Sequence, residues 1–554
     1  MGGVTCGAAP CIQTLAGDDS RPGAAMIAIY DTLSREKRPF VPLVPGQVGI
    51  YLCGPTVYDD CHIGHVAGPT LFDAAARWLR ARGYRVRLVN NITDIDDKII
   101  NRARDTGEPW QAITARYTAQ YVAYLQQLQV DTITDHPRCS DFIPQMVAYI
   151  GDLVAHDHAY AVAGDGVYFD VARHHGYGKL SGRRIEDQQA GARIERDASL
   201  RHPADFCLWK LAKPGEPSWD SPWGGGRPGW HIECSVMSTA LLGANFDIHA
   251  GGDDLKFPHH ENEIAQAEAH SGCYANCWMH NGLLQFEGIK IGKSDPRMKD
   301  QAFRDQFRLD HLLATYGAPT VRFLLLQGHY RRPSDFAPQH LGAQRTALAR
   351  LHKLLGAALG EAALRPLAEI AGEVAAEPAV REAFERFCAV MDDDFRTGDA
   401  IAVLFQLADL ARKPDDARAP LALRTMRDLG RLLGLFMPGD ERATLGETVG
   451  EDSRLGVAMR ALLPLRQQVR AVRDFATADG IRAQLGAVGI VIKDSKDVSN
   501  WQASGSADAE ARLTAVVAVV MELVNGARAR GDGAGAERAL GELAAAGLVG
   551  PAAG

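Results

Sequence analysis

Two short motifs in the sequence contain side chains suited to binding a nucleotide. His62 and His65 stand in Cys-His-Ile-Gly-His, between an apolar run and a helical pattern. Imidazoles at the start of a helix suit phosphate, because free N–H groups and the helix dipole attract anions there. Lys290 and Lys293 stand in Lys-Ile-Gly-Lys-Ser, a loop that can close over a triphosphate. Taken singly, each motif favours a plainer interpretation: structural or metal-binding histidines, and a solvated basic loop.

A second group of residues has the composition of a metal site. His259 and Glu263 lie four residues apart in Phe-Pro-His-His-Glu-Asn-Glu, so on a helix they face the same side. Together with one or two cysteines from elsewhere in the chain, such a pair is compatible with a tetrahedral zinc site. The alternative is a pair of helix-surface residues, which the adjacent histidines and glutamates disfavour.

The segments around these motifs predict a parallel β-sheet. Residues 48–53 form a short apolar run ended by Gly54-Pro55, which indicates a buried strand. Residues 62–82 have helical spacing of apolar side chains, and residues 86–89 indicate the next strand. A strand–loop–helix–strand unit implies a right-handed crossover between parallel strands. Further strands are predicted at 245–249 and 282–286.

The composition along the chain predicts an α/β protein with several domains. We expect a Rossmann-like parallel-sheet catalytic domain with an insertion, then an α-helical bundle and a small C-terminal helical region. The expected boundaries are a disordered tail at 1–25, the catalytic domain at 26–335 with its insertion at about 115–225, the bundle at 336–450, a helical hairpin at 451–502 and a degenerate repeat of it at 503–554. The repeat rests on residues 465–490 and 523–548, which align at an offset of 58 residues. Chance similarity between Ala/Arg-rich helices is the alternative.

In combination, the His-Ile-Gly-His motif after the first strand and the Lys-x-x-Lys-Ser loop after a later one resemble class I aminoacyl-tRNA synthetases. Longer segments resemble the cysteinyl-tRNA synthetases in particular, from about residue 28 to about residue 502. They are Cys53-Gly-Pro-Thr-Val-Tyr-Asp, Asn91-Ile-Thr-Asp-Ile-Asp-Asp-Lys, Gly229-Trp-His-Ile-Glu-Cys and Phe257-Pro-His-His-Glu-Asn-Glu.

The resemblance implies one zinc ion held by four residues: Cys53, Cys234, His259 and Glu263. Zinc binds a thiolate far better than an alcohol, so such an ion would select cysteine over serine without an editing domain. Thr93 and Trp230 are implied to shape the amino-acid pocket.

The resemblance also implies where ATP binds. His62 and His65 would stabilise the α-phosphate, while Lys290 and Lys293 would hold the β- and γ-phosphates of Mg²⁺-bound ATP. Gly251 would allow close approach to adenosine, and Asp254 resembles an acid that binds the ribose. The substrates implied are ATP, L-cysteine and tRNA(Cys), and we expect a cytoplasmic monomer with no membrane partner.

The charge balance restricts how RNA is bound. The formal net charge is −8, which excludes a uniformly basic nucleic-acid binder, so RNA contacts must come from local patches. Arg466, Arg470 and Arg473 are spaced i, i+4, i+7 and predict a basic stripe for tRNA, with a solvated helix face as the alternative. The ten cysteines favour reduced thiols and metal ligation over disulfides.

Several positions depart from the family pattern. The loop reads Lys-Ile-Gly-Lys-Ser where the family usually has Lys-Met-Ser-Lys-Ser, and Ala67 and Asn90 stand where arginine is common. His270, Cys273, Cys277 and His280 offer a loosely spaced alternative metal set, whereas Cys61, Cys139, Cys207 and Cys388 are expected to be structural. Two rival functions fit parts of the sequence: a cysteine ligase acting on an amino sugar, and a zinc-containing RNA-binding protein without catalytic activity.

Overall fold

The computed structural model describes residues 26–183, 200–289, 297, 300–356, 364–413, 416–440, 444, 454–494, 499–503, 509–529 and 533–549. The predicted tail at 1–25 and the loop that carries Lys290 and Lys293 lie outside these residues. No helix among the described residues is long and apolar enough to span a bilayer.

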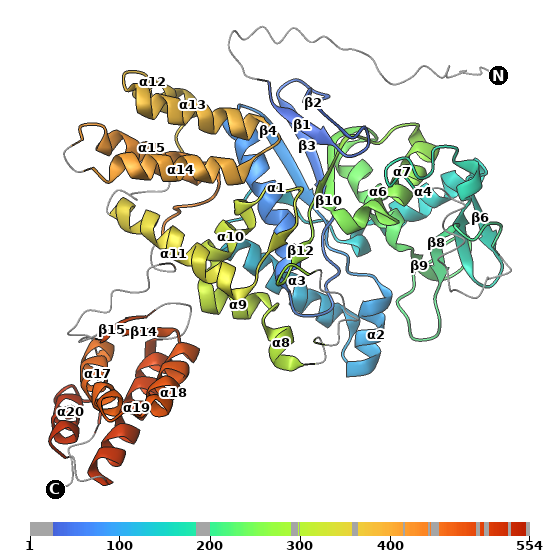
Figure 1. Cartoon of the computed structure of the whole chain (residues 1–554). Helices are drawn as coiled ribbons and strands as arrows, with labels where there is room; N and C mark the ends of the chain where they lie inside the picture. The colour runs from blue at the N-terminus through green and yellow to red at the C-terminus, as the bar shows by residue number, and fades with distance from the viewer. Residues whose placement is uncertain are drawn as a thin grey trace, which may run out of the picture.

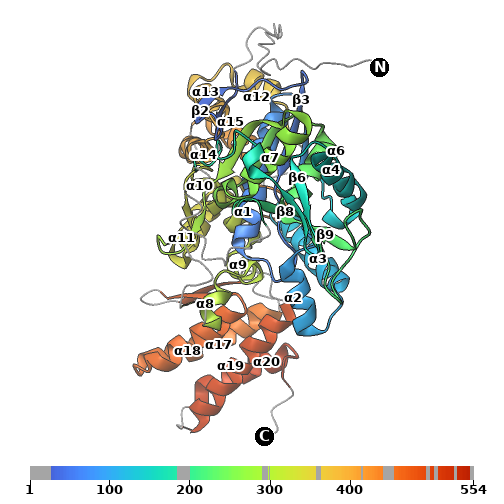
Figure 2. The same cartoon turned by 90° about the vertical axis from the view of Figure 1, so that its right-hand side faces the viewer.

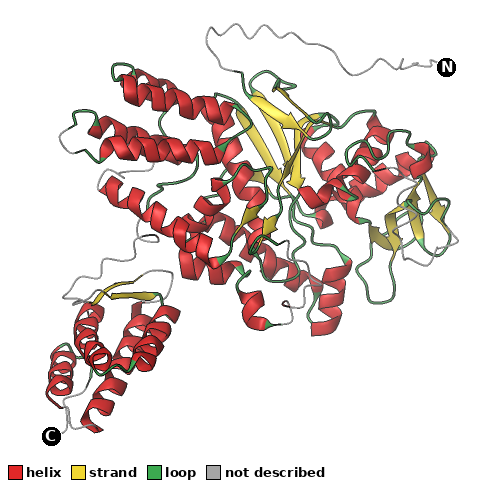
Figure 3. Ribbon diagram, viewed as in Figure 1, coloured by secondary structure: helices red, strands yellow, loops and turns green. Residues whose placement is uncertain are grey.

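A five-stranded parallel sheet forms the centre of the molecule, as the sequence predicts (Figure 3). The strand order is β11-β10-β3-β4-β5, and the bounds are β3 Gln47–Leu52, β4 Arg85–Asn90, β5 Ile133–Asp135, β10 Phe246–Gly252 and β11 Ala275–Asn281. Helix α1, Ile63–Ala81, connects β3 to its parallel neighbour β4. The first crossover is therefore the one that the apolar spacing indicates.

The strand predicted at 282–286 is mostly wrong. The sheet instead ends on β11, whose sequence Ala-Asn-Cys-Trp-Met-His-Asn mixes polar and apolar residues. Residues Leu284–Gln285 form only a short strand, β12, which pairs with β13, Ser334–Asp335. The buried polar side chains of β11 are held by hydrogen bonds, among them His280 Nδ1 to Thr32 Oγ1 at 2.9 Å. A purely apolar strand pattern therefore misses it.

The segment between β5 and β10 is more regular than its composition indicates. It contains helix α4, Ile143–Ala155, and an antiparallel sheet in the order β6-β7-β8-β9. These strands span Ala159–Val162, Gly166–Phe169, Phe206–Leu211 and Gly226–Pro228. Short strands joined by Gly- and Pro-rich turns look irregular in a sequence because each strand contributes only a few alternating residues. An antiparallel hairpin, β1 Ala28–Asp31 and β2 Glu36–Pro39, precedes the main sheet.

The remaining helices flank the sheet and form the bundle (Figure 1). Those near the sheet are α2 Asp97–Thr106, α3 Trp110–Gln127, α6 Trp230–Leu242, α7 His259–Ser271, α8 Gln301–Asp305, α9 Leu309–Tyr316 and α10 Ala318–Gln327. The bundle contains α11 Pro338–Leu355, α12 Leu367–Val374, α13 Pro378–Asp392, α14 Thr397–Ala411 and α15 Ala419–Leu432.

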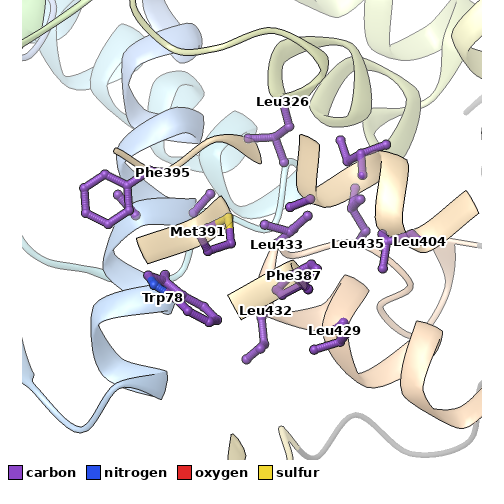
Figure 4. Packing of buried hydrophobic residues seen from close by; sticks show 14 of the residues in the cluster. Trp78, Leu326, Phe387, Met391, Phe395, Leu404, Leu429, Leu432, Leu433 and Leu435 are labelled. Carbon is purple, nitrogen blue, oxygen red and sulfur yellow. The ribbon is translucent and has the colours of Figure 1, made fainter. Parts of the chain in front are cut away.

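Helix α1 is buried between the sheet and the bundle (Figure 4). Trp78 of α1 packs edge-on against Phe387 of α13, with ring centroids 5.9 Å apart, and lies near Leu432 of α15. The Trp78 indole donates a hydrogen bond to Asp392 at 3.0 Å. One continuous core thus joins the bundle to the helix that begins at His62.

His352 of α11 is a fully buried histidine in this core. Neither ring nitrogen has a hydrogen-bond partner in the described part of the chain, and burial lowers the pKa of His352 to about 4. Between pH 6.5 and 4, the unfolded chain therefore binds more protons at residue 352 than the folded chain does. The folded state is for this reason destabilised as the pH falls. From these pKa values, the free energy of unfolding decreases by about 1.4 kcal/mol at pH 5.5 and by about 3 kcal/mol at pH 4.

We expect His352→Leu to reduce the loss of thermal stability between pH 7.5 and pH 5.5. Melting temperatures of the wild type and the variant at both pH values measure this difference. His311→Leu, at an exposed position on α9, should show the same pH dependence as the wild type. A His352→Leu protein with an unchanged pH dependence would contradict the assignment of a buried neutral imidazole.

The C-terminal helices form a group of their own (Figures 1 and 2). Their buried apolar side chains make up a separate hydrophobic core. This part of the chain consists of α17 Arg454–Ala471, α18 Phe475–Ala487, the antiparallel hairpin β14 Ile490–Asp494 and β15 Ser499–Ala503, α19 Ala509–Ala529 and α20 Gly533–Ala545. The helices fall where the repeated segments place them, whereas the β-hairpin is not expected from a helical region. Val516, Val520 and Val524 of α19 are fully buried in the core shared with α17.

Candidate active site and metal cluster

Four side chains meet at the carboxyl edge of the central sheet. Cys53 directly follows β3, Cys234 lies in the first turns of α6, and His259 begins α7 with Glu263 one turn later. Their ligand atoms all lie within 4.8 Å of one another. Cys53 is fixed in this position because its N–H donates to the Ala250 carbonyl of β10 at 3.0 Å.

The distances within this group fit a tetrahedral metal ion. The Sγ atoms of Cys53 and Cys234 are 3.8 Å apart, and His259 Nε2 is 3.1 Å from Glu263 Oε1. With Zn–S bonds of about 2.3 Å at the tetrahedral angle, two sulfur ligands are about 3.8 Å apart. Two sulfurs, one imidazole and one carboxylate are also a donor set that zinc prefers. The residues present therefore fit zinc.

Three further histidines surround the cluster and were not predicted individually. His231 Nδ1 lies 2.9 Å from His259 Nδ1, which directs the other nitrogen of His259 towards Glu263. His249 Nε2 lies 2.8 Å from Glu263 Oε2, and His260 Nε2 lies 3.3 Å from Cys53 Sγ. Such outer contacts orient the ligands of a metal site. In the sequence, the only indication of these three histidines is that each lies in a predicted strand or in a motif of the family.

A second grouping shares two residues with the first. The ligand atoms of Cys53, His249, His260 and Glu263 also lie within 4.8 Å of one another. His260, however, also contacts a residue outside this grouping, because its Nδ1 lies 2.8 Å from His280 Nε2. The first grouping contains both thiols, which are the softer donors, so it suits zinc better.

Burial and neighbouring groups set the ionisation of the cluster. Burial opposes a charge on Cys234, but hydrogen bonding to Cys53 and the proximity of His259 lower its pKa to about 6. Burial raises the pKa of Cys53 well above its usual value, and Cys234 adds to this effect. Glu263 is opposed by burial, yet His249 and His259 lower its pKa overall. One thiolate and one carboxylate are therefore ready for a cation, and a bound metal would favour the second thiolate.

His62 and His65 lie together at the start of α1. His62 is the N-cap: its Nδ1 accepts from the Gly64 N–H at 3.1 Å, and His65 Nδ1 accepts from the His62 N–H at 3.3 Å. The two rings stack with centroids 3.8 Å apart. Residue 62 is exposed and residue 65 half-buried, so the pair is accessible at a positive helix end.

The segment that follows the lysine loop returns to these histidines. Lys290 and Lys293 lie outside the described residues. The Ile63 N–H donates to the Phe307 carbonyl at 3.1 Å, and the Leu309 N–H donates to the Cys61 carbonyl at 2.9 Å. The chain downstream of the loop is therefore fixed against the start of α1.

The residues expected to bind the amino acid and the nucleotide lie around the cluster. Thr93 is buried and accepts from Asn91 Nδ2 at 3.3 Å, whereas Trp230 is 41% exposed and stacks on His259 at 4.2 Å. Asp254 is exposed just after β10. A Cβ at Gly251 would lie 2.7 Å from His260 Cε1. Glycine at position 251 thus makes room for the His260 ring. The sequence analysis expected a different reason for this glycine, namely the close approach of adenosine.

One departure from the family pattern, Asn90, has a structural explanation. Asn90 is buried, donates to the Leu52 carbonyl at 3.1 Å and accepts from Tyr121 OH at 2.7 Å, so it links β3, β4 and α3. Ala67 is buried in α1.

The other cysteines and histidines have separate environments. Cys139 is buried with its Sγ 3.0 Å from Glu233 Oε2, and Cys277 is buried in the main core. His270 stacks on Tyr149 at 3.8 Å, while His280 contacts His260.

The predicted basic stripe is wrong at Arg466. Its side chain is only 1% exposed, and its Nε donates to the Ala478 carbonyl of α18 at 3.3 Å. Because α18, α19 and α20 all pack around α17, this helix has little free surface. Arg470 is half-buried, and Arg473 is exposed beyond the end of α17 with φ +62°.

Comparison with known proteins agrees with this geometry. Residues 39–346 match the family model described as tRNA synthetases class I (C) catalytic domain, and residues 386–437 match the DALR domain. The cysteine--tRNA ligase of Hahella chejuensis is 45% identical over 487 residues, which cover 86% of this chain and 100% of that protein. The cysteine--tRNA ligase of Pseudomonas paraeruginosa is 44% identical over 479 residues, which cover 86% of this chain and 99% of that protein.

Among solved structures, the LeuRS of Agrobacterium radiobacter K84, in a ternary complex with tRNA and LeuAMS, has a TM-score of 0.52. At 13% identity, over 74% of this chain and 86% of that one, this likeness concerns the fold alone. The match to curated relatives over their full length, together with the family models, shows that the chain belongs to the cysteine--tRNA ligase family of class I aminoacyl-tRNA synthetases.

Proposed function

We propose that the protein joins L-cysteine to the 3′ end of tRNA(Cys) in two steps, using Mg²⁺-bound ATP. The observation that carries this proposal is the convergence of Cys53, Cys234, His259 and Glu263 at the same sheet edge from which α1 starts with His62. When bound by these four residues, zinc would supply a Lewis acid that favours a substrate thiolate over a hydroxyl group.

In the first step, a carboxylate oxygen of cysteine attacks the α-phosphorus of ATP. The bond between the α-phosphorus and the oxygen that bridges to the β-phosphorus breaks, so pyrophosphate leaves and cysteinyl-adenylate forms. His62 and His65 would donate hydrogen bonds to the α-phosphate as its charge develops, aided by the start of α1. Lys290 and Lys293 would hold the departing phosphates. No covalent bond to the enzyme is required, because positioning and charge stabilisation suffice.

The residues around the cluster orient the amino acid. Trp230 stacks on His259 and covers the metal ligands on one side, while Thr93 lies buried beside Cys139, with Oγ1 3.9 Å from Sγ. Asp254 at the end of β10 would accept hydrogen bonds from the ribose. In the second step, a ribose hydroxyl of the terminal adenosine attacks the carbonyl carbon of the adenylate. AMP then leaves, and cysteinyl-tRNA is formed.

One pair of assays tests this function. Cysteine-dependent exchange of pyrophosphate into ATP measures the first step, and charging of tRNA(Cys) measures the second. The proposal expects both activities from a monomer. Absence of exchange would leave only an RNA-binding role, and exchange without charging would favour the amino-sugar ligase. The full-length match to cysteine--tRNA ligases and the DALR domain favour charging.

We propose that the turn between α17 and α18 contacts the tRNA anticodon arm. Phe475 is 54% exposed at the start of α18, beside exposed Arg473. An exposed aromatic ring two residues from an exposed arginine suits stacking on an unpaired base and contact with phosphate. Arg470 remains a candidate for the same surface.

Replacing Phe475 with alanine should raise the KM for tRNA about 5- to 150-fold, because one stacked base contributes about 1–3 kcal/mol. Pyrophosphate exchange should be unchanged. Steady-state charging at varied tRNA concentration gives the result, and Phe475→Trp should restore binding. Equal KM values for the wild type and Phe475→Ala would exclude this surface.

A further inference from the structure

A cavity lies outside the cluster, where α10 ends and α14 begins. Its volume is about 620 Å³. Its lining includes three arginines, one histidine and one aspartate, which are Arg331, Arg332, Arg396, His329 and Asp399. We call it the arginine cavity.

Close packing of two helix ends brings the arginines together. A Cβ at Gly398, in the first turn of α14, would lie 2.1 Å from the Gln327 carbonyl oxygen at the end of α10. Thr397 Oγ1 also donates to the Gly328 carbonyl at 3.4 Å. Glycine at position 398 thus lets the two helix ends touch. As a result Arg396, just before α14, faces the segment just after α10.

A buried carboxylate fixes one side of the cavity. Asp394 is 1% exposed and accepts from the Tyr30 N–H at 2.9 Å, Tyr330 OH at 2.8 Å and Arg331 Nε at 3.0 Å. The Arg331 guanidinium also lies over the Tyr30 ring, 4.0 Å from its centroid. Arg331 is therefore held in place while 38% of its side chain remains exposed.

Arg332 has a fixed backbone, and its guanidinium pairs with no carboxylate in the described part of the chain. The Gly282 N–H, at the end of β11, donates to the Tyr330 carbonyl at 2.7 Å, and a Cβ on Gly282 would lie 2.3 Å from the Arg332 carbonyl oxygen. Within the described ranges, no carboxylate lies within 4.0 Å of the Arg332 guanidinium. Arg396, by contrast, pairs with Asp393 at 3.2 Å and Asp399 at 2.6 Å.

The charge and shape of the cavity suit a phosphate group. Two of the three lining arginines are already paired, Arg331 with Asp394 and Arg396 with Asp393 and Asp399. Among the described residues, Arg332 therefore supplies the positive charge of the lining that no carboxylate balances. The planar fork of arginine matches two phosphate oxygens at once, and pre-positioned arginines lose little freedom on binding. The cavity also lies at the carboxyl end of β11, on the same sheet edge as the cluster and His62, and borders the bundle.

We infer that the arginine cavity binds a backbone phosphate of tRNA where it crosses from the catalytic domain to the bundle. This inference rests on the proposed charging function. The cavity lies where α10 ends and α14 begins, so a tRNA that contacts both the catalytic domain and the bundle can reach it. Phosphate contacts of this kind set the register of a nucleic acid and contribute to affinity without reading its sequence. Arg332 supplies the guanidinium that no carboxylate of the described chain neutralises.

Arg332→Gln tests the inference, with the wild type measured alongside. We expect the Kd for tRNA, from fluorescence anisotropy over a series of KCl concentrations, to rise about tenfold. The slope of log Kd against log salt should fall by about one, because one phosphate contact is lost. Cysteine-dependent pyrophosphate exchange by the same preparation verifies that the protein is folded.

Arg412→Gln is the matched control, because Arg412 closes the opposite end of α14. Arg412 pairs with Asp409 at 2.7 Å. Its side chain is 48% exposed, which is similar to the 43% of Arg396 at the other end of the same helix. It should bind tRNA with the wild-type salt slope, whereas Arg396→Gln should behave like Arg332→Gln. An unchanged slope in Arg332→Gln, or an equal loss in Arg412→Gln, would overturn the inference. If the wild type exchanges pyrophosphate but binds no tRNA, the proposed charging function fails as well.

Discussion

A Cys234→Ser protein is expected to contain no zinc and to lose cysteine-dependent pyrophosphate exchange by a factor of about 10⁴ or more. Serine cannot supply a thiolate, and its alcohol is a poor zinc ligand near neutral pH. Cys53, 3.8 Å away in the wild type, would then lack its sulfur partner. Removal of one ligand from a buried set also leaves Glu263 and His259 without the cation that balances them.

Metal content by mass spectrometry and the KM for cysteine in the exchange assay measure these effects. Cys388→Ser is the control, because Cys388 lies in α13 of the bundle and is half-buried. It should retain one zinc per chain and wild-type exchange. A metal-free Cys234→Ser protein that binds cysteine with normal affinity would refute selection by the metal.

Replacement of His62 by asparagine should lower kcat for pyrophosphate exchange by about 10²–10³-fold, which is typical when one donor to a developing charge is removed. The KM for cysteine should change little, because the four cluster residues are intact. Asparagine is chosen because it can still accept the Gly64 N–H at the N-cap, where His62 Nδ1 accepts it at 3.1 Å. A loss of rate then reflects the missing imidazole rather than a frayed helix.

The melting temperature of His62→Asn should therefore stay close to that of the wild type. His311→Asn, exposed on α9, controls for a general effect of losing a histidine. A His62→Asn enzyme with wild-type kcat would remove His62 from the first step and leave His65 and the lysines as the candidates.

The cluster was predictable from sequence because its ligands lie in long, specific segments. Cys53 follows a strand, and His259 and Glu263 lie one helical turn apart, so their positions follow from local rules. The spacing of the residues alone does not reveal which of two adjacent histidines joins the cluster with both cysteines. His259 and His260 are adjacent, and only the packing of α7 against α6 places His231 beside His259.

Predictions that depended on tertiary contacts were less successful. The i, i+4, i+7 spacing correctly puts Arg466 and Arg470 on one side of a helix, but it cannot show that α18 covers Arg466. Likewise, β11 was missed because its polar side chains are satisfied by residues distant in sequence, such as Thr32 for His280. In both cases the deciding partner comes from another element, which periodicity cannot identify.

The position of α19 in the C-terminal core affects the order in which the molecule matures during synthesis. Val516, Val520 and Val524 complete a hydrophobic face shared with α17, and each such buried side chain contributes about 1.5–3 kcal/mol. On the ribosome, α17 therefore remains without its partner until residues beyond 509 have emerged, by which time the N-terminal domain has had time to fold. A nascent chain stalled before α19 would therefore carry a folded N-terminal domain while the apolar face of α17 is still incompletely covered.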